Sequence, residues 1–474
     1  MKNKGLILVL AAVSTVFSTE VSARDNDTTF LHFTGSFVRK DYFVPAYVPF
    51  QMPKNAVKLI VNQSFTTPDG SRGNLDLGLF DEDGYGFNND KGFRGWSGGA
   101  RRSFEISESY ATPGYIPGKL DSGEWYVTQM LVSDVERVDW ALDITIVTGK
   151  NNESAFVPSY AREKINDVPG WYRFDTHVHT HHSDGKCSPE EVAELAAGEG
   201  LDGIFSTDHN TNTSLGHWGN IPDKNFLVIN GIEVTYTDGH WNILDVKPGT
   251  WVDFRFRYNE KDRYEAAVRK AKEDGAVVIA NHPYNITFMH DKSKVDGIEV
   301  WNGPWDATDQ MAVDQWHNLL VAGVCKFATG GSDFHRLSNK IGLPQTVIRC
   351  SSLSRGAVID GLCNGRSYIT GNSDITLDFK VTGDGKIAEI GDDIFAKRPV
   401  VSFTASTSGV LKMYNVNGTF YHAYIQAGEK VEVTVDNRCG WVRAELYDLE
   451  NRMQALTNPI FIYPFPEDTT LVTP

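Results

Sequence analysis

The fold of the central part of this chain is decided by the stretch YRFDTHVHTHHSDGKCSPEE, residues 172–191. Residues 172–178 have the composition of a β-strand. Ser188 and Glu191 then form a capping box with Pro189 at the first helical position, which predicts a helix that ends at Gly200. A strand followed by a helix is the repeating unit of α/β folds, and we therefore expect such a fold here.

Side chains that bind metal ions stand at the end of this predicted strand. His177 and His179 are two residues apart, so both point to one face of a strand and can hold one ion. Asp184 follows in a turn where Ser183 and Gly185 permit a tight reversal of the chain. An H-x-H pair alone is weak evidence for a metal site. Its combination with S-D-G and a capped helix is a far more specific signal of one.

Four further clusters of this kind follow, each close to the end of a predicted strand. Their ligand-type side chains are His209, Glu233, His282, Asp333 and His335. Each residue alone is more often a satisfied core residue or a helix cap. Packing gives no reason to bury all of them at strand ends, because an unpaired group of this type costs on the order of several kcal/mol. A cationic centre would account for their burial.

The types of side chain narrow the choice of ion. Imidazole and carboxylate ligands without thiolates suit Zn, Mn or Fe, whereas sites built only from oxygen suit Mg or Ca. We expect divalent ions and hydrolysis by a metal-bridging hydroxide. The five cysteines form no C-x-x-C pair, which argues against a thiolate zinc site and against a dense disulfide framework. One or two disulfides, for instance Cys350 with Cys363, remain open.

Residues 169–371 predict a series of strands that mostly alternate with helices or loops. The strands are expected at 172–178, 203–207, 226–232, 241–246, 276–280, 297–301 and 326–329, and the helices at 188–200, 260–274 and 308–322. Repeated strand-helix units imply parallel pairing, and ligands at successive C-terminal strand ends imply a barrel with its site on that face. Seven strands predict an incomplete or distorted barrel.

In the two flanking regions, short apolar runs are separated by turn residues, which is typical of β structure. In residues 24–168, strands expected at 57–61, 75–79, 125–132 and 140–147 indicate an antiparallel β-sandwich. In residues 372–474, strands expected at 375–381, 400–404, 410–414, 430–435 and 441–447 indicate a small immunoglobulin-like sandwich. The expected fold class is multidomain, α/β plus β.

Residues 1–23 have the pattern of a secretory signal peptide, with lysines before an apolar run at 6–17 and small residues before Arg24. A membrane anchor is the alternative, although the run is short for a bilayer. No later segment reaches about 18 uninterrupted apolar residues, so we expect an exported protein, periplasmic or secreted, without a later transmembrane segment. The net charge of -16 argues against a nucleic-acid partner, because binding to its backbone needs a basic surface.

Over about residues 171–370, these motifs resemble the polymerase and histidinol phosphatase (PHP) family of metal-dependent phosphoesterases. The resemblance implies a distorted (β/α)7 barrel that holds up to three metal ions. It implies a first ion held by His177, His179, Glu233 and Asp333, a second held by Asp184, His209 and His335, and a further one held by His282 and bridged by Glu233.

The chain departs from the family pattern at Asn242, where many members carry a histidine. His240 lies two residues earlier and shares a predicted strand face with Asn242, so it could replace the ligand, donate a proton or bind the substrate. Two to three ions are therefore expected. Segments 95–102, 112–118, 239–242 and 342–346 resemble the carbaryl-hydrolase-like branch, whose members can cleave carbamate esters instead of phosphates.

The expected reaction is hydrolysis of a small phosphate ester. Asp333 could orient the nucleophile, and His240 or His282 could protonate the leaving oxygen. Lys186 or Arg336 could hold a non-bridging oxygen, although a solvated surface role explains each equally well. Carbamates, carboxyl esters and amides are alternative substrates of the same site. A secreted binding module with a relic barrel is the alternative outside catalysis, and the sequence leaves the oligomeric state open.

Overall fold

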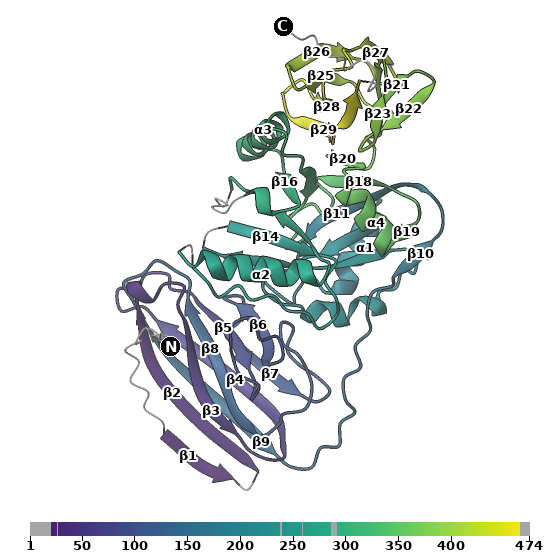
Figure 1. Ribbon diagram of the computed structural model, residues 1–474. Helices are drawn as coiled ribbons and strands as arrows, with labels where there is room; N and C mark the ends of the chain where they lie inside the picture. The colour runs from purple at the N-terminus through teal and green to yellow at the C-terminus, as the bar shows by residue number, and fades with distance from the viewer. Residues whose placement is uncertain (1–19, 26, 238, 258, 286–291, 465–474) are drawn as a thin grey trace, which may run out of the picture. The chain divides into compact units, whose positions relative to one another are not determined.

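The structure is a computed structural model that describes residues 20–25, 27–237, 239–257, 259–285 and 292–464. Residues 1–19 of the expected signal peptide lie outside the described residues, and residues 20–23 belong to strand β1 (Glu20–Asp25). The chain divides into two compact units, residues 1–157 and 158–474 (Figure 1). Among the described residues, no helix combines the length and the apolar character needed to cross a membrane.

The first unit consists of two antiparallel sheets, with the strand orders β1-β2-β9-β4-β7 and β3-β8-β5-β6. Their strands after β1 are β2 (Thr28–Val38), β3 (Pro45–Met52), β4 (Ala56–Thr66), β5 (Leu75–Phe80), β6 (Phe93–Gly98), β7 (Ser103–Ser107), β8 (Gly123–Leu131) and β9 (Arg137–Thr148). Burial alternates along β4, where Leu59 and Val61 are buried and Asn62 is exposed. This period of two residues places one face of each strand in a shared core. The predicted antiparallel sandwich is confirmed.

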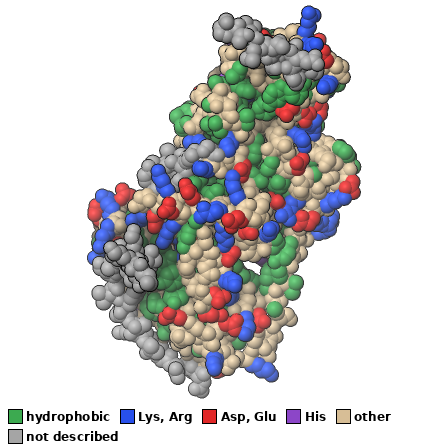
Figure 2. Space-filling view, in the orientation of Figure 1, with side chains coloured by type: hydrophobic (Ala, Val, Ile, Leu, Met, Phe, Trp, Pro, Cys, Tyr) green, Lys and Arg blue, Asp and Glu red, His purple; other side chains and the backbone are tan. Residues whose placement is uncertain are grey.

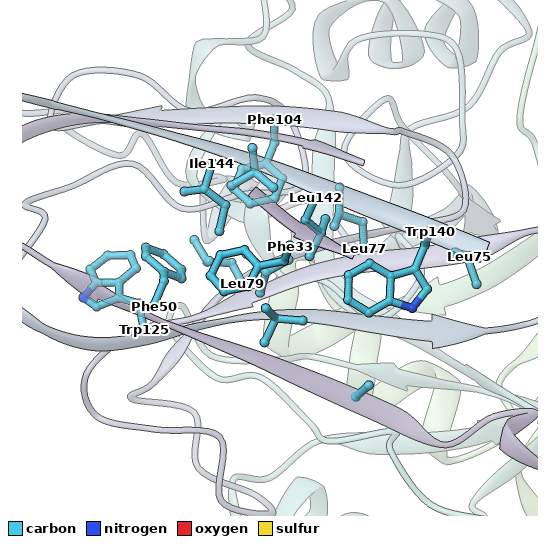
Figure 3. Close-up of a cluster of buried hydrophobic side chains, with 14 of the residues drawn as sticks. Phe33, Phe50, Leu75, Leu77, Leu79, Phe104, Trp125, Trp140, Leu142 and Ile144 are labelled. Carbon is cyan, nitrogen blue, oxygen red and sulfur yellow. The ribbon is translucent and has the colours of Figure 1, made fainter. Parts of the chain in front are cut away.

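Side chains from both sheets fill the space between them (Figure 3). Phe33 and Trp140 come from the first sheet, and Leu77 and Trp125 from the second. Trp140 lies opposite Gly35 in the pairing of β9 with β2. A Cβ atom on Gly35 would lie 2.4 Å from Cζ2 of Trp140, so the ring occupies the space of the missing side chain.

We expect Gly35→Ala to lower the free energy of unfolding by about 1–3 kcal/mol, because the ring of Trp140 must move to admit the methyl group. Gly149→Ala is the control, since a Cβ atom there meets no described atom within 4 Å. Urea unfolding followed by tryptophan fluorescence measures both variants. Equal losses would show that the contact with Trp140 is not the cause.

The second unit is built on one large sheet with the strand order β17-β16-β15-β14-β13-β12-β11-β18-β20-β29-β28-β25-β26. Its first seven strands are β11 (Gly170–Val178), β12 (Gly203–Ser206), β13 (Leu227–Tyr236), β14 (Gly239–Leu244), β15 (Val277–Ala280), β16 (Gly297–Asn302) and β17 (Phe327–Gly331). The sheet curls so that β11 lies close to β17. This is shown by the hydrogen bond that Thr176 Oγ1 donates to the carbonyl oxygen of Gly330 at 3.1 Å. All seven strands lie at or near their predicted positions.

Three helices connect neighbouring strands of this set, namely α1 (Pro189–Gly198), α2 (Lys261–Glu273) and α3 (Ala307–Val321). The predicted capping box of α1 is confirmed: Glu191 N donates to Ser188 Oγ at 3.2 Å, and Ser188 N donates to Glu191 Oε2 at 2.7 Å. The predicted distorted (β/α)7 barrel is found only in part: its seven strands are present, but seven alternating helices are not evident in the described residues, and the strands are not parallel throughout. β14 is antiparallel to both neighbours. The pairing of Tyr236 with Gly239 closes a direct hairpin between β13 and β14, which leaves no length for a helix between these two strands.

The later strands continue the same sheet. β18 (Gln345–Cys350) pairs with β11 and with β20 (Ser367–Thr370), and β20 pairs with β29 (Met453–Thr457). The remaining elements are β10 (Lys164–Asn166), β19 (Leu353–Ser354), α4 (Arg355–Cys363), β21 (Leu377–Gly383), β22 (Lys386–Glu389), β23 (Asp393–Phe395), β24 (Val400–Ala405), β25 (Gly409–Asn415), β26 (Gly418–Ile425), β27 (Val431–Thr434), β28 (Trp441–Tyr447) and β30 (Ile460–Tyr463). A second sheet, β22-β21-β24-β27, shares a hydrophobic core with β25 and β28, which gives the sandwich-like layers expected there.

All five cysteines are free, so the disulfide between Cys350 and Cys363 that the sequence left open is not formed. On the face shown in Figure 2, acidic and basic side chains are interspersed. The predicted domain boundaries at residues 168 and 371 remain predictions.

Candidate metal centre

The eight predicted ligands converge at one end of strands β11 to β17. His177 lies in β11 and Glu233 in β13, while the other six lie in the segments that follow β11, β12, β15 and β17. Their ligand atoms form overlapping groups within which all atoms lie within 4.8 Å of one another. The groups are His179, Asp184, His209 and His335; His177, His179 and Asp333; His177, Glu233 and His282; and His209, Glu233 and His240.

Glu233 belongs to two of the four groups, and its side chain is fully buried. Its Oε1 accepts a hydrogen bond from Asn281 Nδ2 at 2.9 Å, which fixes the carboxylate. The imidazole nitrogens around Oε2 are His177 Nε2 at 3.3 Å, His179 Nε2 at 3.4 Å and His209 Nδ1 at 2.8 Å; those around Oε1 are His240 Nδ1 at 3.1 Å and His282 Nε2 at 3.4 Å. One carboxylate therefore faces five imidazole rings.

Asp333 and Asp184 supply the other carboxylates of the centre. Asp333 Oδ1 lies 3.0 Å from His179 Nε2 and 3.5 Å from His177 Nε2. Asp184 Oδ1 lies 3.2 Å from Nε2 of His335, and 3.7 Å from Nε2 of His209. The two aspartates thus extend the cluster away from Glu233.

Two ligands have a left-handed backbone conformation, with φ of 24° at His282 and 52° at Asp333. Residues other than glycine rarely adopt positive φ, which costs on the order of 1–3 kcal/mol. Such residues persist where the surrounding structure fixes them, and they concentrate at functional sites. The backbone therefore holds these two side chains at the strand ends against a local cost.

Several ligand atoms are buried without a hydrogen bond to any described residue. They are His177 Nε2, His179 Nε2, Asp184 Oδ1, Glu233 Oε2 and Asp333 Oδ1. His209 Nδ1 lies 2.8 Å from Glu233 Oε2 and 2.5 Å from Thr235 Oγ1. An unsatisfied buried polar atom costs about 1–3 kcal/mol. Nitrogen and oxygen atoms that face one another in this way fit a divalent ion of the Zn, Mn or Fe type.

Three of the imidazoles are oriented through their second nitrogen. The contacts of Nδ1 are Glu299 Oε1 at 2.9 Å for His177, Thr235 Oγ1 at 2.5 Å for His209, and the carbonyl oxygen of Asp333 at 2.8 Å for His335. A proton held on Nδ1 leaves the lone pair on Nε2, which faces Glu233 in His177 and Asp184 in His209 and His335. Metal-binding histidines typically show this arrangement.

Burial and mutual contact displace the pKa values of these groups. Burial opposes charge on Glu233, but the imidazoles of His177, His209 and His240 outweigh it and hold the pKa of the carboxyl well below its usual range. Burial also opposes charge on His209, yet Glu233 and Asp184 raise its pKa to about 9. Without an ion, Glu233 and Asp184 thus favour a proton on His209, whereas burial and the neighbouring imidazoles of His209 and His335 lower the pKa of His179 to about 4. A cation that binds His209 must displace its proton, which makes the affinity depend on pH.

The cluster is closed on one side and open on the other. The side chains of His177, His179 and Glu233 are 0% exposed, whereas that of Asp184 is 46% exposed. The side chains of His209 and His335, beside Asp184, are 21% and 23% exposed, so this is the accessible side of the cluster. The groups on that side are carboxylates and imidazoles, so an anionic substrate needs the positive charge of bound ions.

The structure brings His240 into one of the four ligand groups. Lys186 and Arg336 are exposed, and the main-chain N–H of Lys186 donates to the carbonyl oxygen of His335 at 2.7 Å. Asn242 is buried beside Asn281, whose Oδ1 accepts a hydrogen bond from Asn242 N at 3.2 Å. Within the described residues, Oδ1 of Asn242 makes no hydrogen bond.

Two acidic residues of the centre escaped the sequence reasoning. Asp208 is fully buried and accepts hydrogen bonds from Thr180 N at 2.8 Å and from Ser183 Oγ at 2.7 Å, so it fixes the turn before Asp184. Glu299 contacts His177, as described above. A signal for Glu299 was present, because GIEV at residues 297–300 repeats GIEV at 231–234, which carries Glu233.

No protein-family model and no curated protein match the chain. Among solved structures, it is similar to a two-domain protein from Bacteroides vulgatus that contains a predicted PHP-like metal-dependent phosphoesterase, with 16% identity, 66% of this chain and 100% of that chain covered, and a TM-score of 0.36. An amidohydrolase from Chromobacterium violaceum with bound sulfate and no metal shares 16% identity over 36% of this chain and 89% of its own, with a TM-score of 0.27. A putative metal-dependent phosphoesterase from Bifidobacterium adolescentis shares 18% identity over 40% and 95%, with a TM-score of 0.26. Likeness at these levels does not establish a family.

Proposed function

We propose that this protein is a metal-dependent hydrolase of small phosphate esters, of the PHP type and of its carbaryl-hydrolase-like branch. The observation that carries the proposal is the set of buried nitrogen and oxygen atoms without hydrogen bonds around Glu233. Protein interiors avoid such atoms, and bound cations would satisfy them. Open access at Asp184 gives those cations a place to meet a substrate.

Two to three divalent ions are proposed. The ligands are His177, His179, Glu233 and Asp333 for the first ion, Asp184, His209 and His335 for the second, and Glu233 and His282, with His240 close by, for the third. Ions in these positions would lower the pKa of water towards about 7 and stabilise negative charge on the transferred group.

The protein's own side chains hold and move protons in this proposal. Asp333 Oδ1 accepts a hydrogen bond from the attacking water and thereby orients it. His240 donates a proton to the leaving oxygen, with its Nδ1 held near Glu233 Oε1 at 3.1 Å. Lys186 and Arg336, exposed in the loops of Asp184 and His335, bind the non-bridging oxygens. His282 is the second candidate for the proton donor.

Hydrolysis by the purified protein tests this proposal. The protein is stripped with a chelator, reloaded with Zn, Mn or Fe, and assayed on p-nitrophenyl phosphate, bis-p-nitrophenyl phosphate and a naphthyl carbamate. We expect phosphate turnover that appears with metal and disappears with the chelator. Turnover of the carbamate alone would contradict the proposed substrate and favour a carbamate or ester hydrolase. If the protein shows neither bound metal nor turnover, the result would favour a binding module with a relic barrel.

We further propose export to the periplasm or the exterior, on the basis of the leader pattern in residues 1–23. N-terminal sequencing of the protein expressed in a bacterial host, after fractionation of the cells, tests this proposal. A mature N-terminus at Arg24 in the exported fraction is expected, and an uncleaved chain in the cytoplasm would contradict it.

A further inference from the structure

Glu299 lies in β16 and is outside the ligand groups, yet it contacts two ligands. Its side chain is 2% exposed. Oε1 lies 2.9 Å from Nδ1 of His177. Oε2 accepts hydrogen bonds from the main-chain N–H of His282 at 3.0 Å and from Asn302 Nδ2 at 3.1 Å. Both carboxylate oxygens are thus engaged by groups from three segments of the chain.

The two ligands that Glu299 contacts belong to one group, together with Glu233. His177 lies in β11, and His282 follows β15, so no backbone hydrogen-bond ladder relates them directly. Their rings nevertheless stack, with centroids 5.7 Å apart and planes 16° apart. Glu299 acts on the rotation of the first ring and on the backbone of the second residue, where φ is 24°.

We infer that Glu299 is a positioning residue that aligns His177 and His282 towards a single ion beside Glu233. The inference rests on the proposed function for the presence of that ion and goes beyond it in making ion occupancy depend on a residue that binds no ion. Outer carboxylates of metal-binding histidines fix the ring and raise its basicity. Glu299 adds a restraint on the strained main chain of a second ligand.

Glu299 needs two acceptor oxygens, one for the ring of His177 and one for the N–H groups of His282 and Asn302, and a carboxylate supplies both. The groups that face Glu299 are all N–H donors, from the ring of His177, the backbone of His282 and the amide of Asn302. Glutamine has the same shape but a single acceptor oxygen, and its NH2 group would face a donor on one side or the other. Glu299→Gln therefore tests the charge and the second acceptor at nearly constant volume.

We expect Glu299→Gln to weaken binding of the affected ion by about 10- to 100-fold, with one equivalent of metal lost on dialysis. Titration with Mn or Zn and elemental analysis of the dialysed protein measure this. In the metal-free protein labelled with 15N-histidine, we expect the Nδ1 proton of His177 to exchange slowly in the wild type and rapidly in Glu299→Gln. Equal affinities within about threefold and unchanged exchange would overturn the inference.

Glu445→Gln is the matched control, because Glu445 is also 2% exposed and its Oε1 accepts a hydrogen bond from Arg443 Nη1 at 2.6 Å, but it lies outside the ligand groups. Glu445→Gln should lose stability while keeping its full metal content. If Glu445→Gln also lost metal, the metal loss in Glu299→Gln would be a result of general destabilisation. Circular dichroism confirms that each variant is folded. If the wild type binds no metal, the proposed function fails, whereas the proton exchange of His177 still decides whether Glu299 positions the ring.

Discussion

Glu233→Gln is expected to lower phosphate ester turnover by at least about 100-fold and to remove metal from the buried part of the centre. Loss of an outer partner of a metal ligand typically costs 10- to 100-fold, and Glu233 is itself directed at the ions of two ligand groups. The amide has no negative charge to offer the five imidazoles around it. Elemental analysis and steady-state kinetics on p-nitrophenyl phosphate measure the two effects.

The same substitution should reduce the stability of the metal-free protein. Removing one partner of a buried charged pair costs about 3–5 kcal/mol, because the other charge remains buried without compensation. The carboxylates of Glu299, Asp333 and Glu233 outweigh burial and raise the pKa of His177 well above its usual range, so this loss applies at neutral pH. Glu445→Gln again serves as control, since it should lose stability without losing metal. Normal metal content in Glu233→Gln would refute the centre.

Asp333→Asn is expected to abolish turnover with a smaller loss of stability than Glu233→Gln, because the Asp333 side chain is 25% exposed whereas that of Glu233 is 0% exposed. Asparagine tolerates the left-handed conformation found at this position, where φ is 52°, so the fold should accept it. The change removes the charge that lies 3.0 Å from His179 Nε2, and we expect a loss of at least about 100-fold in kcat. Thermal unfolding and initial rates on p-nitrophenyl phosphate measure the two quantities.

Asp384→Asn provides the control for this variant. Asp384 has the same left-handed conformation, with φ of 51°, but is exposed in the turn between β21 and β22. It should retain wild-type turnover. Comparable activity in the two variants would exclude a role for the Asp333 carboxylate in the reaction.

The positions of the strands and most ligands follow from local patterns in the sequence. Spacings of two residues, as in His177 and His179, fix a common strand face without reference to the rest of the fold. Capping residues such as Ser188 act within four residues and are visible for the same reason. The ends of helices and strands, where chain reversals and polar groups coincide, are therefore the features that this sequence predicts best.

The remainder depends on contacts between distant segments. Glu299 lies within an apolar strand, and although GIEV at 297–300 repeats the sequence around Glu233, its contact with His177, 122 positions away, depends on the place of β16 in the fold. The hairpin of β13 and β14 was missed because both strands have the buried, apolar composition that parallel strands share. The Asp-Gly pair at residues 238–239 was the local signal for that hairpin.

The continuity of the sheet from β11 through β18 and β20 to β29 has a consequence for the integrity of the metal centre. β20 pairs on one side with β18, which pairs with the strand that carries His177, and on the other with β29. A chain shortened after residue 371 would expose the edge of β20, and unpaired edges recruit other molecules. The C-terminal strands thus cover the edge of β20. We expect the segments that hold the metal ligands and the last strands to unfold together in one cooperative transition.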